Sequence, residues 1–178
     1  MLIRNFQDTD IVEASKLAKL TWGDFYTEEP PELQKMIYDF MIEYYDRNRN
    51  YSFSIIENGL RGFILAFTKN DKYTKQPDFN GEKIAQDLFN YLELCGKEVE
   101  NIMEADDIML GLFVSIQKGC GRQLLQKLSE SCKGNIYLWT DTTCDCDYYA
   151  KNNFELIKKF DIEVNNNTIT TLIYKKSR

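Results

Sequence analysis

Gly119 and Gly121, two glycines that bracket a cysteine, lie between an apolar run and a helical pattern. The run, Ile108–Val114, is rich in branched and aromatic residues, which predicts a buried strand. The leucines that follow recur at helical spacing, which predicts a helix. A strand, a glycine turn and a helix start form an anion site, because the first helical N–H groups point at the ligand. Pyrophosphate is the usual ligand, although the pattern also fits a plain tight connection.

The chain contains no histidine, and this limits the acid–base chemistry available to it. Nucleophilic catalysis with a histidine base is excluded in its usual forms. Any general base must be a carboxylate, a tyrosine, a lysine or a water molecule. Asp106 and Asp107 are acidic candidates directly before the apolar run. Cys144 and Cys146 suggest half a zinc site, but no histidine or second cysteine pair completes it, so we predict no metal.

Composition narrows the class of protein. The 178 residues, 43% of them hydrophobic, fit a globular chain with one domain. The net charge of −6 argues against nucleic-acid binding, which usually needs a basic surface, and it leaves a cationic small molecule as a partner. No apolar run approaches a membrane span and the first residues lack a signal-peptide core, so we expect no membrane association. Five cysteines, an odd number, are typical of reduced thiols, and we expect a cytoplasmic protein.

Periodicity and turn residues predict the elements that position these groups. We expect strands at Leu2–Phe6, Tyr51–Glu57, Leu60–Thr68, Ile108–Val114, Asn135–Thr140, Phe154–Val164 and Thr168–Lys175. We expect five helices: one that begins after Asp8, one that begins at Pro30 and Pro31, one at Glu82–Glu104 with a break at Gly96, one from the glycine turn to Gly134, and a short one that ends at Lys151. Asn58-Gly59 predicts a tight hairpin, and Asn165–Asn167 a final turn. The order predicts an α/β fold with a mixed, mostly antiparallel sheet, and a parallel pair where the central helix crosses over.

Two motifs in this order resemble those of the GNAT superfamily of acyl-CoA-dependent N-acetyltransferases. The first is the segment LGLFVSIQKGCGRQLL, which is similar to the family's central strand and acyl-CoA pyrophosphate loop. Gly119 and Gly121 match the loop, and Lys118 and Arg122 are residues commonly seen there. Ile116 departs from the pattern, because the family usually has Gln or Arg at this position, and Gln117 stands one residue later.

The second motif is Tyr149-Ala150-Lys151-Asn152-Asn153-Phe154, which resembles the family's YxKxGF ending of the last helix. Asn153 replaces the glycine. Asparagine is the residue that best imitates glycine in a left-handed backbone conformation, so we expect the motif to keep its shape.

The resemblance implies a GNAT-like sheet with a splayed central strand pair flanked by helices. It further implies one N-acetyltransferase-like domain over residues 1–178, with a helical insertion at about 69–105. Acetyl-CoA would be the co-substrate. The backbone of Leu112, Phe113 and Val114 would pair with the pantetheine amides, because splayed strands leave peptide groups unpaired. The list of expected pyrophosphate and cofactor contacts comprises Gln117, Lys118, Gly119, Cys120, Gly121 and Arg122, with Thr142 after the next strand.

The resemblance also assigns catalytic roles. Tyr149 stands where the family places the tyrosine that protonates the leaving thiolate; a phenol with a pKa of about 10 is a proton donor at neutral pH. Asp106 and Asp107 are the candidates for a general base or for attraction of a cationic amine. A solvated acidic turn is the alternative for them, and a core aromatic residue is the alternative for Tyr149.

Two function classes follow. One is direct transfer of an acetyl group from acetyl-CoA to a primary amine in a ternary complex, with a small-molecule amine favoured. The other is a non-catalytic acyl-CoA-binding or regulatory module, which the departure at Ile116 favours. The turn lacks the full GxxxxGK[ST] pattern, which argues against ATP. The long final strands could pair across a homodimer, and the sequence does not identify the acceptor.

Overall fold

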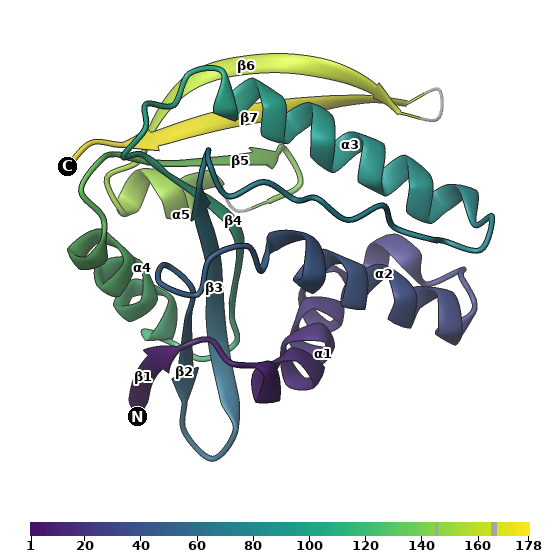
Figure 1. Ribbon diagram of the computed structural model, residues 1–178, viewed down its shortest axis with the longest axis horizontal. Coiled ribbons are helices and arrows are strands. Elements are labelled where there is room, and N and C mark those ends of the chain that lie inside the picture. Colours follow the sequence, from purple (N-terminus) through teal and green to yellow (C-terminus); the bar gives the residue numbers. More distant parts are fainter. Residues whose placement is uncertain (145, 165–166) are drawn as a thin grey trace.

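A seven-stranded sheet in the order β1-β2-β3-β4-β5-β7-β6 forms the centre of the computed structural model (Figure 1). The structure describes residues 1–144, 146–164 and 167–178. The strands are β1 (Leu2–Asn5), β2 (Phe53–Ile56), β3 (Leu60–Thr68), β4 (Ile108–Ser115), β5 (Ile136–Asp141), β6 (Glu155–Val164) and β7 (Asn167–Lys176). Neighbouring strands are antiparallel, except that β4 and β5 are parallel, as the crossover through the central helix predicts.

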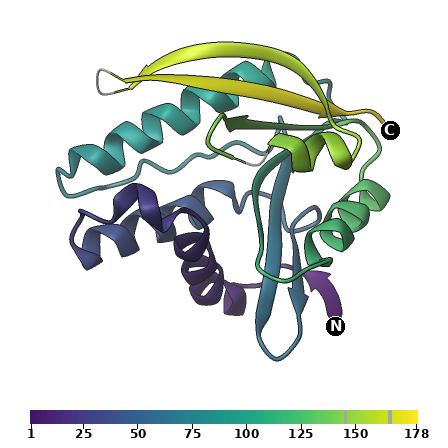
Figure 2. The same cartoon turned by 180° about the vertical axis from the view of Figure 1, so that it is seen from behind.

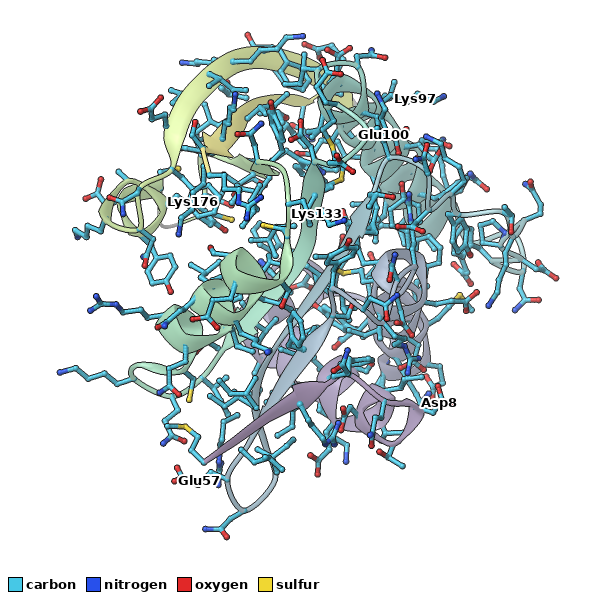
Figure 3. All side chains as sticks on the ribbon, turned by 60° about the vertical axis from the view of Figure 1, so that its left-hand side comes forward. Asp8, Glu57, Lys97, Glu100, Lys133 and Lys176 are labelled. Carbon is cyan, nitrogen blue, oxygen red and sulfur yellow. The ribbon has the colours of Figure 1, made fainter. Side chains whose placement is uncertain are left out.

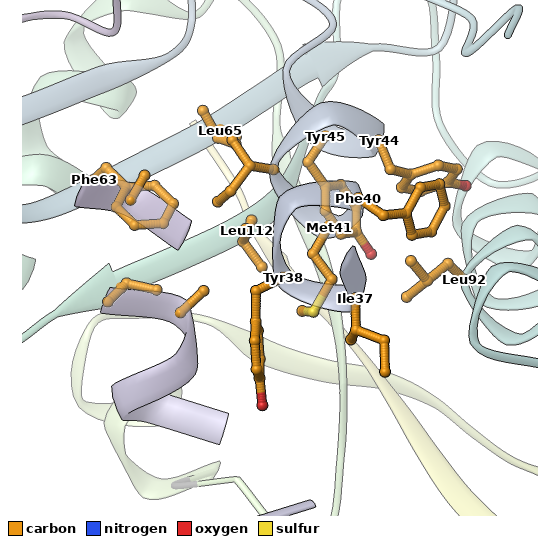
Figure 4. Packing of buried hydrophobic residues seen from close by; sticks show 14 of the residues in the cluster. Ile37, Tyr38, Phe40, Met41, Tyr44, Tyr45, Phe63, Leu65, Leu92 and Leu112 are labelled. Atoms are coloured by element: carbon orange, nitrogen blue, oxygen red, sulfur yellow. The ribbon is translucent and has the colours of Figure 1, made fainter. Parts of the chain in front are cut away.

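Helices cover both faces of this sheet (Figures 1 and 2). They are α1 (Ile11–Trp22), α2 (Pro31–Tyr45), α3 (Lys83–Glu100), α4 (Cys120–Ser131) and α5 (Cys146–Lys151), with short 3-10 turns at η1 (Asp8–Asp10) and η2 (Gly23–Tyr26). The face under α1, α2 and α3 has an aromatic core that includes Tyr38, Phe40 and Tyr45 (Figure 4). The face under α4 has an aliphatic core that includes Leu124 and Leu128. No helix of the described ranges is long and apolar enough to cross a membrane.

Strands β4 and β5 pair only at their beginnings. Ile108 lies opposite Ile136 and Met109 opposite Tyr137, and no further pair forms between these strands in the described ranges. Beyond this point β4 keeps its pairing with β3, and β5 keeps its pairing with β7. The predicted splayed pair is therefore confirmed, and the β5 side of β4 is left without a strand partner.

Gly111 forms a β-bulge in the splayed part of β4. Leu110 lies opposite Ala66 and Leu112 opposite Leu65, so that Gly111 has no partner on β3. A Cβ atom at position 111 would lie 2.2 Å from Cδ1 of Tyr45. A bulge bends the strand and re-aims its backbone. Here it is possible because glycine leaves room for the Tyr45 ring.

One predicted turn and one predicted helix break can be compared with the structure. Asn58 (φ 53°) and Gly59 (φ 110°) join β2 and β3 in the left-handed region, which confirms the hairpin. The predicted helix break at Gly96 is wrong, because α3 continues through this residue. A Cβ atom at position 96 would lie 3.7 Å from the Tyr44 hydroxyl. Residues 165 and 166 of the last predicted turn lie outside the described residues.

A buried ion pair between Arg4 and Asp10 joins β1 to the η1 turn that follows it. The carboxylate of Asp10 accepts two hydrogen bonds from Arg4, at 2.7 and 2.6 Å, and one from the Ser54 hydroxyl at 2.7 Å. The backbone N–H of Gln7 donates a further one at 3.0 Å. Burial alone would raise the pKa of Asp10, but the hydrogen bonds from Arg4, Ser54 and Gln7 outweigh it and lower the pKa.

Candidate active site

A cavity of about 350 Å³ opens where β4 and β5 diverge. Its walls come from both strands, from α2 and α3, and from η2. The side chains of Met41 and Leu88 contribute apolar surface, and the aromatic rings of Trp22, Tyr45 and Trp139 enclose the space. This volume is near the lower end of the range for small-molecule sites. The splay of the sheet thus creates a ligand-sized space beside the open edge of β4.

The predicted strand contacts divide between this cavity and the core. Leu112 and Phe113 line the cavity, with Leu110 and Gly111 before them. The side chain of Val114 is buried in the core under α1–α3. Thr142 is exposed in the turn after β5 and does not line the cavity, whereas its neighbour Asp141 does.

The glycine turn precedes α4 with free backbone donors. Gly119 has φ 87°, and a Cβ atom there would meet nothing within 4 Å, so its surroundings are open. The Cys120 N–H donates to the carbonyl of Gln117 at 3.1 Å. Within the described ranges, the N–H groups of Gly119, Gly121 and Arg122 have no protein acceptor. Donors at the start of a helix form an anion site when they point into open space.

Two residues of the turn do not face this anion site with their side chains. Gln117 donates through Nε2 to the Glu57 carboxylate at 2.7 Å, and Glu57 lies at the end of the β2–β3 hairpin (Figure 3). The Cys120 thiol is buried and lies 3.4 Å from the sulfur of Met1. Lys118 and Arg122 are exposed and free to meet a phosphate. Backbone groups and these two cations are therefore the donors that the turn offers.

Gly121 has a different reason to be glycine. A Cβ atom there would lie 2.6 Å from the Tyr148 hydroxyl and 3.0 Å from Cζ of Phe113. The rings of Tyr148 and Phe113 are 5.9 Å apart. Tyr148 of α5 therefore packs across the first turn of α4, and this contact holds α5 beside the cavity.

Tyr149 reaches the cavity from α5. Its ring packs edge-on against Phe154 at 5.9 Å and beside Tyr174 at 5.6 Å, which fixes its orientation. Burial raises the pKa of the Tyr149 hydroxyl, and the neighbouring Cys144 and Cys146 raise it further. The phenol is therefore a proton donor throughout the neutral and mildly alkaline range. Asn153, at the end of α5, has φ 64°, which confirms that it takes the left-handed conformation of the glycine it replaces.

Asp106 and Asp107 do not lie in the cavity. The Asp107 side chain is buried, and its carboxylate accepts hydrogen bonds from the backbone N–H and the side-chain amide of Asn135, at 2.7 and 2.9 Å. It also accepts one from the N–H of Glu104 at 2.8 Å. Asp106 is exposed beside it. Both residues are at the end where β4 and β5 are still paired, so these contacts give Asp107 a structural role, and we propose neither as a base.

Two other carboxylates do line the cavity, Asp87 on α3 and Asp141 at the end of β5. Neither residue was predicted from the sequence as part of a site. A signal for Asp141 was present, because it directly follows a predicted buried strand, and parallel strands bring their carboxyl ends to one edge of a sheet. Asp87 carried no such signal, since it lies in the helix at 83–100, whose packing the sequence left undefined.

Comparisons with known proteins place this geometry in a structural class. No protein-family model matches the chain. No curated protein matches it either. Solved structures do. An N-acetyltransferase from Staphylococcus aureus Mu50 superposes with a TM-score of 0.60 at 19% identity, covering 97% of this chain and 100% of that one.

Two further solved structures agree with this. A GNAT-family acetyltransferase from Bacillus cereus ATCC 10987 gives a TM-score of 0.59 at 11% identity, over 99% and 96% of the two chains. The C-terminal condensation domain of Ebony, in complex with beta-alanyl-dopamine, gives 0.67 at 11% identity, over 99% and 98%. The chain therefore has the GNAT acetyltransferase fold, and the splayed strands and glycine turn occupy the places that the resemblance implied.

Proposed function

We propose that this protein transfers the acetyl group of acetyl-CoA to the primary amine of a small molecule, by direct attack in a ternary complex. The observation that carries the proposal is the cavity between β4 and β5. It is lined by the strand edge of β4 that has no partner and by the closely packed Tyr149. Strand β4 leads from this cavity into the glycine turn. The fold of the solved neighbours and the small volume of the cavity support it.

Acetyl-CoA fits the donors that the chain offers. Its peptide-like pantetheine would pair with the backbone at Leu112–Val114, where β4 has no strand partner on its β5 side. The turn from Gln117 to Arg122 would hold the pyrophosphate through backbone N–H groups and through the side chains of Lys118 and Arg122. Thr142 remains a proposed contact from the turn after β5.

Tyr149 supplies the proton that the reaction needs at its end. The neutral amine attacks the thioester carbonyl, the N–C bond forms, and the C–S bond breaks. The Tyr149 hydroxyl gives its proton to the leaving sulfur and recovers one from solvent or from the amine. Its raised pKa keeps it protonated, and the ring contacts hold it in place.

The non-catalytic alternative has one observation in its favour. Ile116, at the position that departs from the family motif, is 46% exposed, and its N–H donates to the Arg61 carbonyl at 3.0 Å. Glu57 adds a negative charge near the turn through its bond to Gln117. Weak acyl-CoA binding without turnover would follow if these features dominate.

Calorimetric titration with acetyl-CoA and CoA tests the proposed site. We expect micromolar binding of both, and loss of binding by tenfold or more in Gly119→Val. Gly81→Val is a matched control, because Gly81 also has a positive φ (83° against 87°) and also faces open space, but lies in the loop before α3. No binding at millimolar ligand, or equal loss in both variants, would overturn the proposed site.

Tyr149→Phe separates the enzyme from the binding module. We expect kcat to fall by about 10²–10⁴-fold, the usual contribution of general acid–base catalysis, with unchanged acetyl-CoA affinity. Tyr51→Phe, on a half-buried tyrosine before β2, is the control. A Tyr149→Phe enzyme as fast as wild type would remove the catalytic role, and no turnover of wild type with any amine would favour the module.

A further inference from the structure

The cavity between β4 and β5 is lined by acidic side chains and, among the described residues, by no basic ones. Among its lining residues, all within the described ranges, there is no lysine or arginine, and the only carboxylates are Asp87 and Asp141. Eight of the lining residues are aromatic, and they are Trp22, Phe25, Tyr26, Tyr45, Tyr91, Phe113, Trp139 and Tyr149. A ligand that fits this surface is apolar over most of its length and positively charged at one point.

Asp87 and Asp141 differ in whether a cationic side chain already neutralises their charge. Asp87 forms an ion pair with Lys83 at 2.9 Å, at the exposed side of α3. Asp141 forms no ion pair in the described part of the chain; its Oδ1 accepts from the N–H of Thr143 at 2.8 Å and from the Thr143 hydroxyl. These bonds orient the Asp141 carboxylate without neutralising its charge, which leaves it able to bind a cation.

Asp141 lines the same cavity as Tyr149, the proposed proton donor. The Cys144 N–H donates to the Asp141 backbone carbonyl at 3.3 Å, and Cys144 lines the cavity together with Tyr149. On the other side, Asp141 is close enough to Tyr91 to raise its pKa, although burial raises that pKa more. Tyr91 packs edge-on against Trp139 with ring centres 5.3 Å apart. An ammonium group at Asp141 would therefore share the cavity with Tyr149 and with the aromatic pair of Tyr91 and Trp139.

We infer that the acceptor is a monoamine with an aromatic or compact apolar body, and that Asp141 binds its ammonium group. This rests on the proposed function, whose acceptor site it specifies. Polyamines and polycationic sugars are poorer fits, because the described lining offers their second charge no carboxylate other than Asp87, which is already paired with Lys83.

The two tryptophans of the chain, Trp22 and Trp139, both line the cavity, so intrinsic fluorescence reports on its occupancy. The experiment titrates the CoA-saturated protein with 2-phenylethylamine, with its uncharged analogue 2-phenylethanol, and with spermidine. We expect 2-phenylethylamine to bind at least tenfold more tightly than either competitor. Asp141→Asn should abolish the preference over the alcohol, because Asn keeps an oxygen for Thr143 but removes the charge. Glu130→Gln, an exposed charge removal on α4, should keep it.

Three results would overturn the inference: equal binding of the amine and the alcohol, spermidine binding as tightly as 2-phenylethylamine, or an Asp141→Asn variant that keeps the preference. Acetyl transfer to the same compounds separates this inference from the proposed function. Transfer to spermidine but not to 2-phenylethylamine would refute the acceptor class and leave the acetyltransferase standing. Absence of CoA binding in calorimetry would remove both.

Discussion

Gly111→Ala should destabilise the protein, because a methyl group there would overlap the rings of Tyr45 and Phe67. Gly111 does not have a positive φ, so its backbone conformation alone does not require glycine. A Cβ atom, however, would lie 2.2 Å from Cδ1 and 2.8 Å from Cε1 of Tyr45, and 2.8 Å from Cε1 of Phe67. The rings of Tyr45 and Phe67 are buried in the aromatic core, where Figure 4 shows Tyr45 above Met41 and beside Leu112. Neither ring can move without displacing its neighbours.

The expected loss in the free energy of unfolding follows from overpacking of the core. Forcing a methyl group into a well-packed core costs about 1–3 kcal/mol, and contacts this short call for the upper part of that range. Replacing glycine by alanine also restricts the unfolded chain, which returns about 0.4–1 kcal/mol. The net loss in the free energy of unfolding is then about 2 kcal/mol. For a chain of this length it lowers Tm by about 4–8 °C.

Denaturant unfolding followed by tryptophan fluorescence measures this loss. Gly23→Ala is the control, because Gly23 has helical angles (φ −59°, ψ −28°) and a Cβ there would meet only Lys19 Cγ at 3.9 Å. It should be neutral or stabilising by about 0.4–1 kcal/mol. A cycle with Tyr45→Ala isolates the contact, since the alanine should cost at least about 1 kcal/mol less once the ring is gone. An equal cost of Gly111→Ala in both backgrounds would refute the reasoning.

Three further predictions concern stability. Asn153→Ala should lose about 1 kcal/mol in denaturant unfolding, because alanine lacks the tolerance of Asn for φ 64°, whereas Asn153→Gly should be nearly neutral. Asp107→Ala should lose about 2–4 kcal/mol in the same assay, because three donors lose their acceptor, while exposed Asp106→Ala should change little; equal losses would contradict the structural role. Asp10 has a pKa below its ordinary value of 3.8, so its bond to Arg4 stabilises the fold above that pH and is lost as the pH falls further. Unfolding curves between pH 5 and pH 2 should therefore show a smaller difference between wild type and Asp10→Asn at the acidic end.

Local sequence signals predicted the local structure well. Asn58-Gly59 marks a hairpin because both residues take positive φ, and Asn153 ends α5 for the same reason. The apolar run before Gly119 became β4, and its parallel partner follows α4 in the order expected for a crossover. These features depend on backbone preferences and periodicity, which neighbouring residues determine.

The surroundings of several site residues could not be predicted from the sequence, because they depend on contacts between distant segments. Gln117 meets Glu57, 60 positions away, and so turns its side chain away from the expected phosphate contact. Asp107 resembles a catalytic carboxylate in sequence because it stands at the start of the central strand. Its bonds to Asn135 appear only when β5 is laid beside β4. Gly111 shows no local signal either, since only the position of Tyr45 makes a side chain there impossible.

The two ends of the β4–β5 pair explain how the chain can combine a stable sheet with an open site. At the paired end, the buried Asp107 carboxylate ties the start of β4 to Asn135 before β5, and this fixes the angle from which the strands diverge. At the open end, β4 carries the bulge at Gly111, where the missing side chain leaves room for the ring of Tyr45. A ligand then meets preformed walls instead of having to separate two strands, so less of its binding energy is spent on reorganisation. The net charge of −6 would favour the approach of the proposed cationic amine, and the described residues that line the cavity include no lysine or arginine.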